Sequence, residues 1–262
     1  MTLRFRPACP EDYPLFLRLY RELRVEDPPA NEEVWASHVA PDAWIMEREG
    51  APVAYAFRQV LDEEGYLRHL VVDPGFRGEG LGHAAMEQLT RELRAAGVRR
   101  LRLNVKPDNR AAIALYERHG LRRSHGAVSL RLAFAAREGL PVEPTLVVRE
   151  ARPDELAELE RAATPPLPKG QLARQAGRDG VWILIVGGEG LAVFDAGFGG
   201  SFPFRATRAA VARALLDAMA ERASKPEVLL VVEDDVGLAD TLRGVGATTN
   251  VAFDHYVGEP TD

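Results

Sequence analysis

Cysteine is almost missing from this chain: Cys9 is the only one among 262 residues. A single thiol cannot form an intramolecular disulfide, and it excludes a metal cluster built on cysteines. A buried structural cysteine is a simpler interpretation of Cys9 than a catalytic nucleophile. With 46% hydrophobic residues, the chain is expected to fold around ordinary apolar cores.

Long hydrophobic runs are missing as well. The longest apolar stretch is Val181–Val186, far short of the roughly 20 residues that a helix needs to cross a bilayer. The first residues, Met-Thr-Leu-Arg-Phe-Arg, lack the apolar core of a signal peptide. These absences predict a soluble, cytoplasmic protein with no membrane partner.

An excess of basic charge is also missing. The chain has 33 Lys and Arg against 39 Asp and Glu, a net charge of −6. Residues 1–140 carry 21 basic and 20 acidic side chains, and the remainder carries 12 and 19. A tight nucleic-acid binder normally presents a basic face, so we expect no nucleic-acid partner.

A pattern near the start of the chain returns about half-way along it. Residues 2–11 and 145–154, 143 positions apart, each read as a short strand followed by a helix-starting proline and acidic residues. A second block, 81–109, matches 207–235 at an offset of 126. Two blocks in the same order favour a duplication over chance similarity between two α/β halves. The Pro- and Gly-containing segment 138–144 predicts a linker between domains at 1–137 and 145–262.

Hydrophobic periodicity in the first copy predicts a mixed α/β fold, with a largely antiparallel sheet flanked by helices. A hairpin is expected to turn at Glu49-Gly50. Helices are expected at 10–24, 31–39, 80–96 and 109–119, and strands at 2–6, 42–48, 51–60, 65–72, 99–105, 120–124 and 127–134.

The segment 70–83 combines an apolar strand with a glycine-rich loop. The strand breaks at Pro74, and Gly78, Gly80 and Gly82 then lead into an amphipathic helix. Alternating glycines let several backbone N–H groups point into one concavity, and the helix N-terminus adds the positive end of its dipole. The sequence therefore predicts an anion-binding loop.

Other glycine-loop motifs fit this segment poorly. A P-loop requires Gly-Lys-Ser or Gly-Lys-Thr, which the chain lacks. A dinucleotide fingerprint requires its third glycine where His83 stands. In a purely structural turn, three glycines would raise the conformational entropy of the unfolded chain and so lower stability, with no compensating function.

Two motifs together resemble those of the GNAT N-acetyltransferase superfamily. After Leu70-Val-Val-Asp-Pro, the residues Arg77-Gly-Glu-Gly-Leu-Gly82 fit its acetyl-CoA signature, (Arg/Gln)-Xaa-Xaa-Gly-Xaa-(Gly/Ala). The segment Asn109-Arg-Ala-Ala-Ile-Ala-Leu-Tyr116-Glu-Arg-His-Gly120 fits the second signature, in the expected order and spacing. The resemblance covers the first copy nearly end to end and implies a tandem member of the superfamily.

The resemblance implies a site for acetyl-CoA as co-substrate, with no metal. The strand before the loop would splay from its neighbour and pair with the pantetheine arm, and one of its N–H groups would stabilise the thioester oxyanion. The backbone of the loop would hold the pyrophosphate. These two roles fall on Leu70, Val71 and Val72, and on Gly78, Glu79, Gly80, Leu81, Gly82 and His83.

Two side chains of the implied cofactor site have a second interpretation. Arg77 either contacts a phosphate or lies on the surface. Asn109 would bond the pantetheine, but asparagine is also a good helix cap, and it could do both.

Tyr116 and His69 are the candidate catalytic residues. Direct transfer leaves a thiolate, which a phenol held near the sulfur can protonate; the alternative is that Tyr116 is merely buried on its helix. Some peptide-acetylating members carry a glutamate base where this chain has Asn104. His69 is then the candidate base, because imidazole titrates in a suitable range. Tyr66 is another candidate, and His69 could instead be structural or contact the substrate.

The second copy lacks these features. At the offset of 126, the loop glycines become Phe204, Ala206 and Arg208, and Tyr116 becomes Leu242. Asn109 becomes Asp235. We therefore expect the second copy to keep the fold, to have lost acetyl-CoA binding and to act structurally.

The resemblance implies an N-acetyltransferase that acetylates a primary amine of a small molecule or peptide by direct attack in a ternary complex. The alternative is a non-catalytic acetyl-CoA sensor or regulatory subunit, since no base is evident. The duplicated chain predicts either a monomer with an internal pseudo-dimer or a homodimer.

Overall fold

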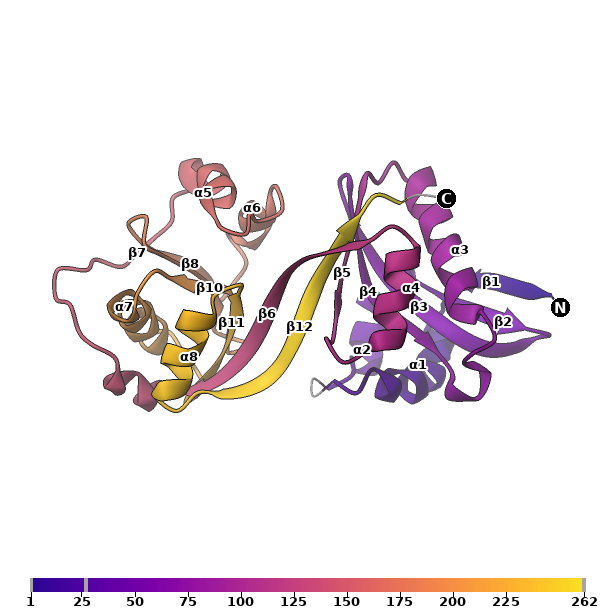
Figure 1. Cartoon of the computed structure of the whole chain (residues 1–262), viewed down its shortest axis with the longest axis horizontal. Helices are drawn as coiled ribbons and strands as arrows, with labels where there is room; N and C mark the ends of the chain where they lie inside the picture. The colour runs from indigo at the N-terminus through magenta and orange to yellow at the C-terminus, as the bar shows by residue number, and fades with distance from the viewer. Residues whose placement is uncertain (1, 26–27, 261–262) are drawn as a thin grey trace. The chain divides into compact units, whose positions relative to one another are not determined.

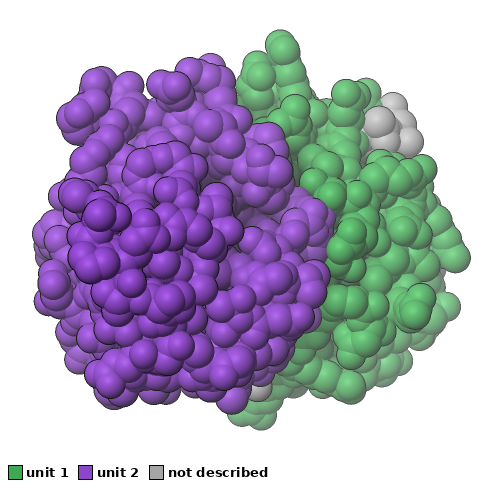
Figure 2. All heavy atoms as spheres, turned by 60° about the vertical axis from the view of Figure 1, so that its left-hand side comes forward, with its two compact units in different colours: residues 1–124, 254–262 green, residues 125–253 purple. Residues whose placement is uncertain are grey.

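The computed structural model describes residues 2–25 and 28–260. Its contacts divide the chain into two compact units, coloured green and purple in Figure 2: Met1–Ser124 with Asp254–Asp262, and His125–Phe253. Each unit contains part of the 12-stranded sheet and has its own hydrophobic core. The mixed, largely antiparallel α/β class predicted from the sequence is confirmed.

The sheet of the first unit has the strand order β1-β2-β3-β4-β5-β12 (Figure 1). Its neighbours are antiparallel except β4 and β5, which are parallel. The main elements of the first copy are β1 Leu3–Pro7, α1 Tyr13–Tyr20, α2 Glu32–Val34, β2 Ala43–Arg48, β3 Ala51–Leu61, β4 Glu64–Val72, α3 Leu81–Ala95, β5 Arg100–Val105, α4 Arg110–Arg118 and β6 Arg122–Ala133. The strand β12 Thr248–Gly258 pairs with β5.

Alternation along the strands places a core on each face of this sheet. In β2, Trp44 and Met46 pack in the same core as α3, whereas Ile45 packs in the core that contains α1. Successive strand residues point to opposite faces, so one strand serves both cores. The predicted hairpin turn between β2 and β3 is confirmed: Glu49 and Gly50 have φ values of +52° and +85°, which a two-residue type I′ turn requires.

The sheet of the second unit has the order β6-β11-β10-β9-β8-β7. Its parallel pair is β10 and β11, as β4 and β5 are in the first unit. Helices and strands follow one another in the same order as in the first unit, as expected for a duplication. The elements are β7 Arg149–Glu150, α5 Leu156–Ala162, α6 Gln171–Gln175, β8 Val181–Val186, β9 Gly190–Asp195, β10 Gly200–Ala206, α7 Ala209–Ala220, β11 Glu227–Glu233 and α8 Val236–Gly244.

The last strand of each copy pairs outside its own copy, and this changes the predicted boundaries. In β6, residues 127–133 pair with β11, whereas residues 254–258 of β12 pair with β5. The compact units therefore divide after Ser124 and Phe253 rather than at the predicted linker 138–144. The reason is that a strand belongs to the ladder that satisfies its backbone. The two strands expected at 120–124 and 127–134 form the single strand β6.

Tyr256 gives a test of this exchange, because it lies near the C-terminus but is a core residue of the first unit. It is 4% exposed and shares a cluster with Leu103 and Tyr116. Tyr256→Ala is expected to lower the free energy of unfolding by about 3 kcal/mol, as large-to-small core substitutions do. Urea denaturation measures the change. Phe198→Ala, at a 60% exposed phenylalanine, should change it by under about 1 kcal/mol, and an equally small effect of Tyr256→Ala would contradict the pairing of β12 with β5.

Among the described residues, no helix combines the length and the apolar character needed to cross a bilayer.

Candidate functional site

Strands β4 and β5 separate part-way along their length. They pair in parallel from Glu64–Arg100 to Leu67–Leu103, and no further pair between them is found in the described part of the chain. The ladder between β3 and β4 shifts at the same point, so that Arg68 is an extra residue on β4. Such a bulge bends its strand. The strands of the first unit therefore diverge where the sequence resemblance predicts that they splay.

Beyond the bulge, β4 keeps only one partner strand. Leu70, Val71 and Val72 pair with Ala56, Tyr55 and Ala54 of β3. Their edge toward β5 has no ladder partner among the described residues. Backbone groups on such an edge are available to an added extended segment.

The loop between β4 and α3 depends on glycine for its backbone conformation. Gly78 and Gly80 have φ values of +82° and +80°, which side-chain-bearing residues rarely adopt. Gly80 is the N-cap of α3, a helix of 15 residues. At Gly82, an added Cβ would lie 3.2 Å from Cδ2 of Leu115 on α4, which is a tight contact. The loop thus ends in a helix N-terminus whose first N–H groups have no intrahelical partner.

Arg77 and Glu79 of this loop have partners within the first unit. Arg77 Nη2 donates to Glu22, at 2.9 Å, and its Nε donates to the carbonyl of Val72, at 3.1 Å. Glu79 forms an ion pair with Arg48. Arg77 therefore ties the loop to the end of β4 in this structure, and its contact with a phosphate remains a prediction.

His83, in the first turn of α3, lies against a histidine that the sequence analysis did not single out. His83 Nδ1 is 2.8 Å from His119 Nε2, and His83 Nε2 is 3.3 Å from Glu87. Burial and the neighbouring His83 lower the pKa of His119. The position of His119 one turn after Tyr116 on the predicted helix could have indicated that it reaches the same end of α3.

Asn109 is the N-cap of α4: its Oδ1 accepts a hydrogen bond from the N–H of Ala112, at 3.2 Å. The capping alternative is therefore observed, and a bond from the Asn109 amide to pantetheine remains a prediction.

Tyr116 lies inside the core of the first unit, on α4. It is 8% exposed and shares its cluster with Leu81, while Leu70 and Val72 pack against that cluster. Burial raises the pKa of Tyr116 to about 12. No hydrogen bond to its hydroxyl is found among the described residues. The phenol is thus protonated at neutral pH and lies in the cluster that the end of β4 contacts.

His69 lies among aromatic rings on β4. Its Nδ1 is 3.1 Å from the hydroxyl of Tyr55, and the rings of Tyr20 and Phe57 contact it edge-on. Burial, and to a lesser degree the charge of Arg68, lower the pKa of His69 to about 4. This environment favours the structural or substrate-contact interpretation of His69 over the role of base. The aromatic neighbours were not predicted, because they come from separate elements.

The lowered pKa of His69 predicts a pH dependence of stability. An unfolded histidine has a pKa near 6.5. Between about pH 6.5 and pH 4, the unfolded state therefore binds a proton at this residue and the folded state does not. The contribution of neutral His69 to the free energy of unfolding is therefore fully present above about pH 6.5, and it falls as the pH is lowered toward 4. Urea midpoints at pH 4.5–7 measure this slope, which His69→Asn should reduce. The exposed His38 provides the control: if His38→Asn reduced the slope equally, His69 would not be its source.

The second unit has no counterpart of the glycine loop. Only Thr207 and Arg208 connect β10 to α7. Phe204 and Ala206, expected from the sequence to stand in a substituted loop, lie in β10 itself and are buried. Leu242 is fully buried in α8, and Asp235 caps that helix by accepting from Leu238. The connection is thus shortened rather than substituted.

A sheet that opens between two parallel strands, beside a glycine-capped helix and a buried tyrosine, defines an N-acetyltransferase fold. Residues 11–121 match the model of the acetyltransferase (GNAT) family, so the first copy contains a domain of this family. The matched segment contains the loop and Tyr116.

Two relatives are similar to this chain over part of their length. [Ribosomal protein bS18]-alanine N-acetyltransferase of Escherichia coli (strain K12) is 43% identical over 75 residues, which are 29% of this chain and 51% of that protein. Mycothiol acetyltransferase of Beutenbergia cavernae is 40% identical over 80 residues, 29% of this chain and 27% of that protein. The chain thus spans about half the length of the first relative and about a quarter of the second.

Two solved structures resemble the fold over nearly the whole chain. A GCN5-related N-acetyltransferase from Sphaerobacter thermophilus has a TM-score of 0.70 at 20% identity, covering 99% of this chain and 96% of that one. A tandem GNAT protein from the clavulanic acid biosynthesis pathway has a TM-score of 0.55 at 15% identity, covering 100% and 99%. The tandem arrangement predicted from the sequence therefore has structural relatives.

Proposed function

We propose that the first unit transfers an acetyl group from acetyl-CoA to a primary amine of a small molecule or peptide. The observation that carries the proposal is the unpaired edge of Leu70, Val71 and Val72, which leads into the glycine loop and the first turn of α3. One continuous stretch of backbone can then bind the pantetheine arm by strand addition and the pyrophosphate by its N–H groups.

The reaction is a direct attack in a ternary complex, without a covalent enzyme intermediate. The amine nitrogen forms a bond to the thioester carbon, an N–H of the β4 edge stabilises the oxyanion, and the carbon–sulfur bond then breaks. Tyr116 donates its hydroxyl proton toward the departing sulfur. Its pKa of about 12 keeps the phenol protonated at the start of each turnover.

The amine must also lose a proton. A histidine with a pKa of about 4, as burial gives His69, accepts a proton from an ammonium group only weakly. We therefore place His69 beside the acceptor, with solvent water taking the proton. The same weakness favours the second candidate function, a sensor that binds acetyl-CoA without turnover.

Release of free coenzyme A, measured with a thiol reagent, tests the activity. The panel includes a peptide that starts with alanine, because one relative is named for an alanine of a ribosomal protein, together with small aliphatic amines. Turnover on any acceptor supports the enzyme. Binding of acetyl-CoA without turnover on the whole panel would favour the sensor.

Calorimetry of the full chain is expected to give one acetyl-CoA bound per chain, because only the first unit has the glycine loop. An isolated fragment 145–262 is unsuitable, since it would lack the strand β6 that pairs with β11. A stoichiometry of two would contradict the assignment of acetyl-CoA binding to the first unit alone.

A further inference from the structure

The second unit has a cavity where its own sheet opens. Strands β10 and β11 pair in parallel only at Gly200–Leu229 and Ser201–Leu230 within the described residues. A cavity of about 340 Å³ is lined by the ends of both strands, by the β8–β9 turn and by residues of α5 and α8. Its volume falls at the small end of the range for small-molecule sites.

Arg205 of β10 gives this cavity an unused hydrogen-bonding capacity. Its Nη2 donates to Glu233, at 2.6 Å, but its Nε and Nη1 are buried and have no hydrogen-bond partner. Glu233 also contacts His125 Nε2, at 3.2 Å. Buried donors normally have a partner, and an exception calls for a missing ligand or ion.

The carboxylates that line the cavity differ from Arg205, because each has a partner. Glu189 accepts from Arg208 Nε, at 2.9 Å, and from the hydroxyl of Thr207, at 3.3 Å. Asp235 accepts from the N–H of Leu238, at 2.8 Å. The unpartnered hydrogen-bond donors at the cavity therefore belong to the cationic Arg205. A ligand that matches them carries an anionic acceptor group.

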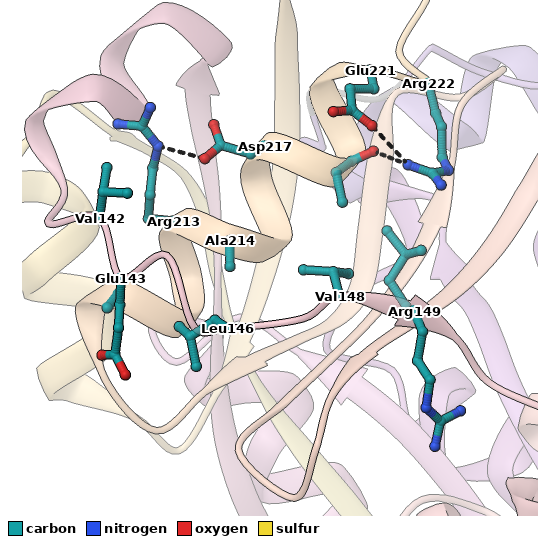
Figure 3. A pocket seen from close by; sticks show the side chains of 13 residues that line it. Val142, Glu143, Leu146, Val148, Arg149, Arg213, Ala214, Asp217, Glu221 and Arg222 are labelled. Carbon is teal, nitrogen blue, oxygen red and sulfur yellow. Dashed lines mark hydrogen bonds and ion pairs between the residues drawn. The ribbon is translucent and has the colours of Figure 1, made fainter.

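A second cavity of this unit has a similar volume but no buried, unpartnered charged atom among the described residues. It measures about 310 Å³ and lies between α7 and the segment Val142–Arg149 (Figure 3). Arg213 Nε donates to Asp217, at 2.8 Å, and Arg222 lies 3.6 Å from Glu221.

We propose that the Arg205 cavity binds a small aliphatic carboxylate. Arg205 hydrogen-bonds the carboxylate, and Leu159, Phe204 and Leu238, which line the cavity, contact the aliphatic chain. The ligand is not acetyl-CoA, because the two-residue connection between β10 and α7 offers no pyrophosphate loop. This site is independent of the activity proposed for the first unit.

Calorimetry with the full chain and aliphatic carboxylates of four to eight carbons tests the proposal, with 4-methylpentanoate as the first probe and 4-methylpentanamide as its neutral match. We expect the acid to bind and the amide to bind at least about tenfold more weakly, the size of a lost charge-assisted hydrogen bond. Equal binding of acid and amide, or no binding of any acid at millimolar concentration, would overturn the proposal.

Variants locate the bound acid. Arg205→Gln should weaken binding at least about tenfold. Because that change also leaves Glu233 with one partner fewer, Ala162→Trp provides a second test: it keeps Arg205 and fills the cavity from an exposed position on α5. Arg222→Gln, in the cavity of Figure 3, should leave binding unchanged. Binding that survives both Arg205→Gln and Ala162→Trp would place the acid elsewhere and refute the site.

Discussion

Tyr116→Phe is expected to lower kcat for acetyl transfer about 100- to 1000-fold, which lies within the roughly 100- to 10,000-fold range that a positioned general acid contributes. The KM for acetyl-CoA should change little, because the substitution removes a hydroxyl and leaves the ring in the core that Leu70 and Val72 contact. Steady-state kinetics with the best acceptor of the amine panel measures both quantities.

A buried tyrosine elsewhere in the same core provides the matched control. Tyr256 is 4% exposed, and its hydroxyl donates to Glu117, at 3.3 Å, so Tyr256→Phe removes a hydroxyl from the same cluster. It should retain nearly all of kcat. Unchanged turnover in Tyr116→Phe, or an equal loss in Tyr256→Phe, would remove Tyr116 from the chemistry.

The pH profile adds a second readout for Tyr116. Burial raises its pKa to about 12, so the phenol keeps its proton through the whole range in which the protein can be assayed. Loss of this proton should therefore not lower the kcat of the native protein below about pH 11. Any alkaline decline of kcat in that range should also be present in Tyr116→Phe.

Gly80→Asp is expected to weaken acetyl-CoA binding at least about 30-fold, because a carboxylate at the N-cap of α3 repels the pyrophosphate. The substitution also places a side chain at a φ of +80°, which costs about 1 kcal/mol or more of stability. Calorimetry gives the affinity, and thermal unfolding gives the strain.

Gly97 separates the two effects. It follows the other end of α3, has a φ of +78°, and, like Gly80, has no atom within 4 Å of an added Cβ. Gly97→Asp should therefore cost similar stability and leave acetyl-CoA affinity within about twofold. If the two variants weakened binding equally, the loop would act only through the stability of α3 and not as a phosphate site.

The local features of the site could be predicted because short-range chemistry determines them. Gly78 and Gly80 adopt positive φ values that few other residues tolerate, and Asn109 accepts from a neighbouring N–H of its own helix. The hairpin at Glu49-Gly50 has the same local origin. Each depends on a few consecutive residues, so the sequence contains the information.

The acid–base properties of the site could not be predicted in this way. The alternation of β4 placed His69 next to Leu70, but its aromatic neighbours Tyr20 and Tyr55 come from α1 and β3. They supply the burial that lowers its pKa to about 4. An isolated histidine titrates near neutrality, so the sequence alone suggested a better base than the fold provides.

The sequence by itself determined that the chain is duplicated, that its first copy has a glycine-capped helix suited to an anion, and that its second copy lacks one. Tertiary structure alone decided which strand completes which sheet. β6 and β12 are both apolar strands after similar helices, and either could satisfy the free backbone of β5 or β11. Their pairing depends on contacts between residues more than 90 positions apart, which no local pattern encodes. The same long-range packing buries Arg205 beside Glu233 and makes the cavity of the second unit a candidate binding site.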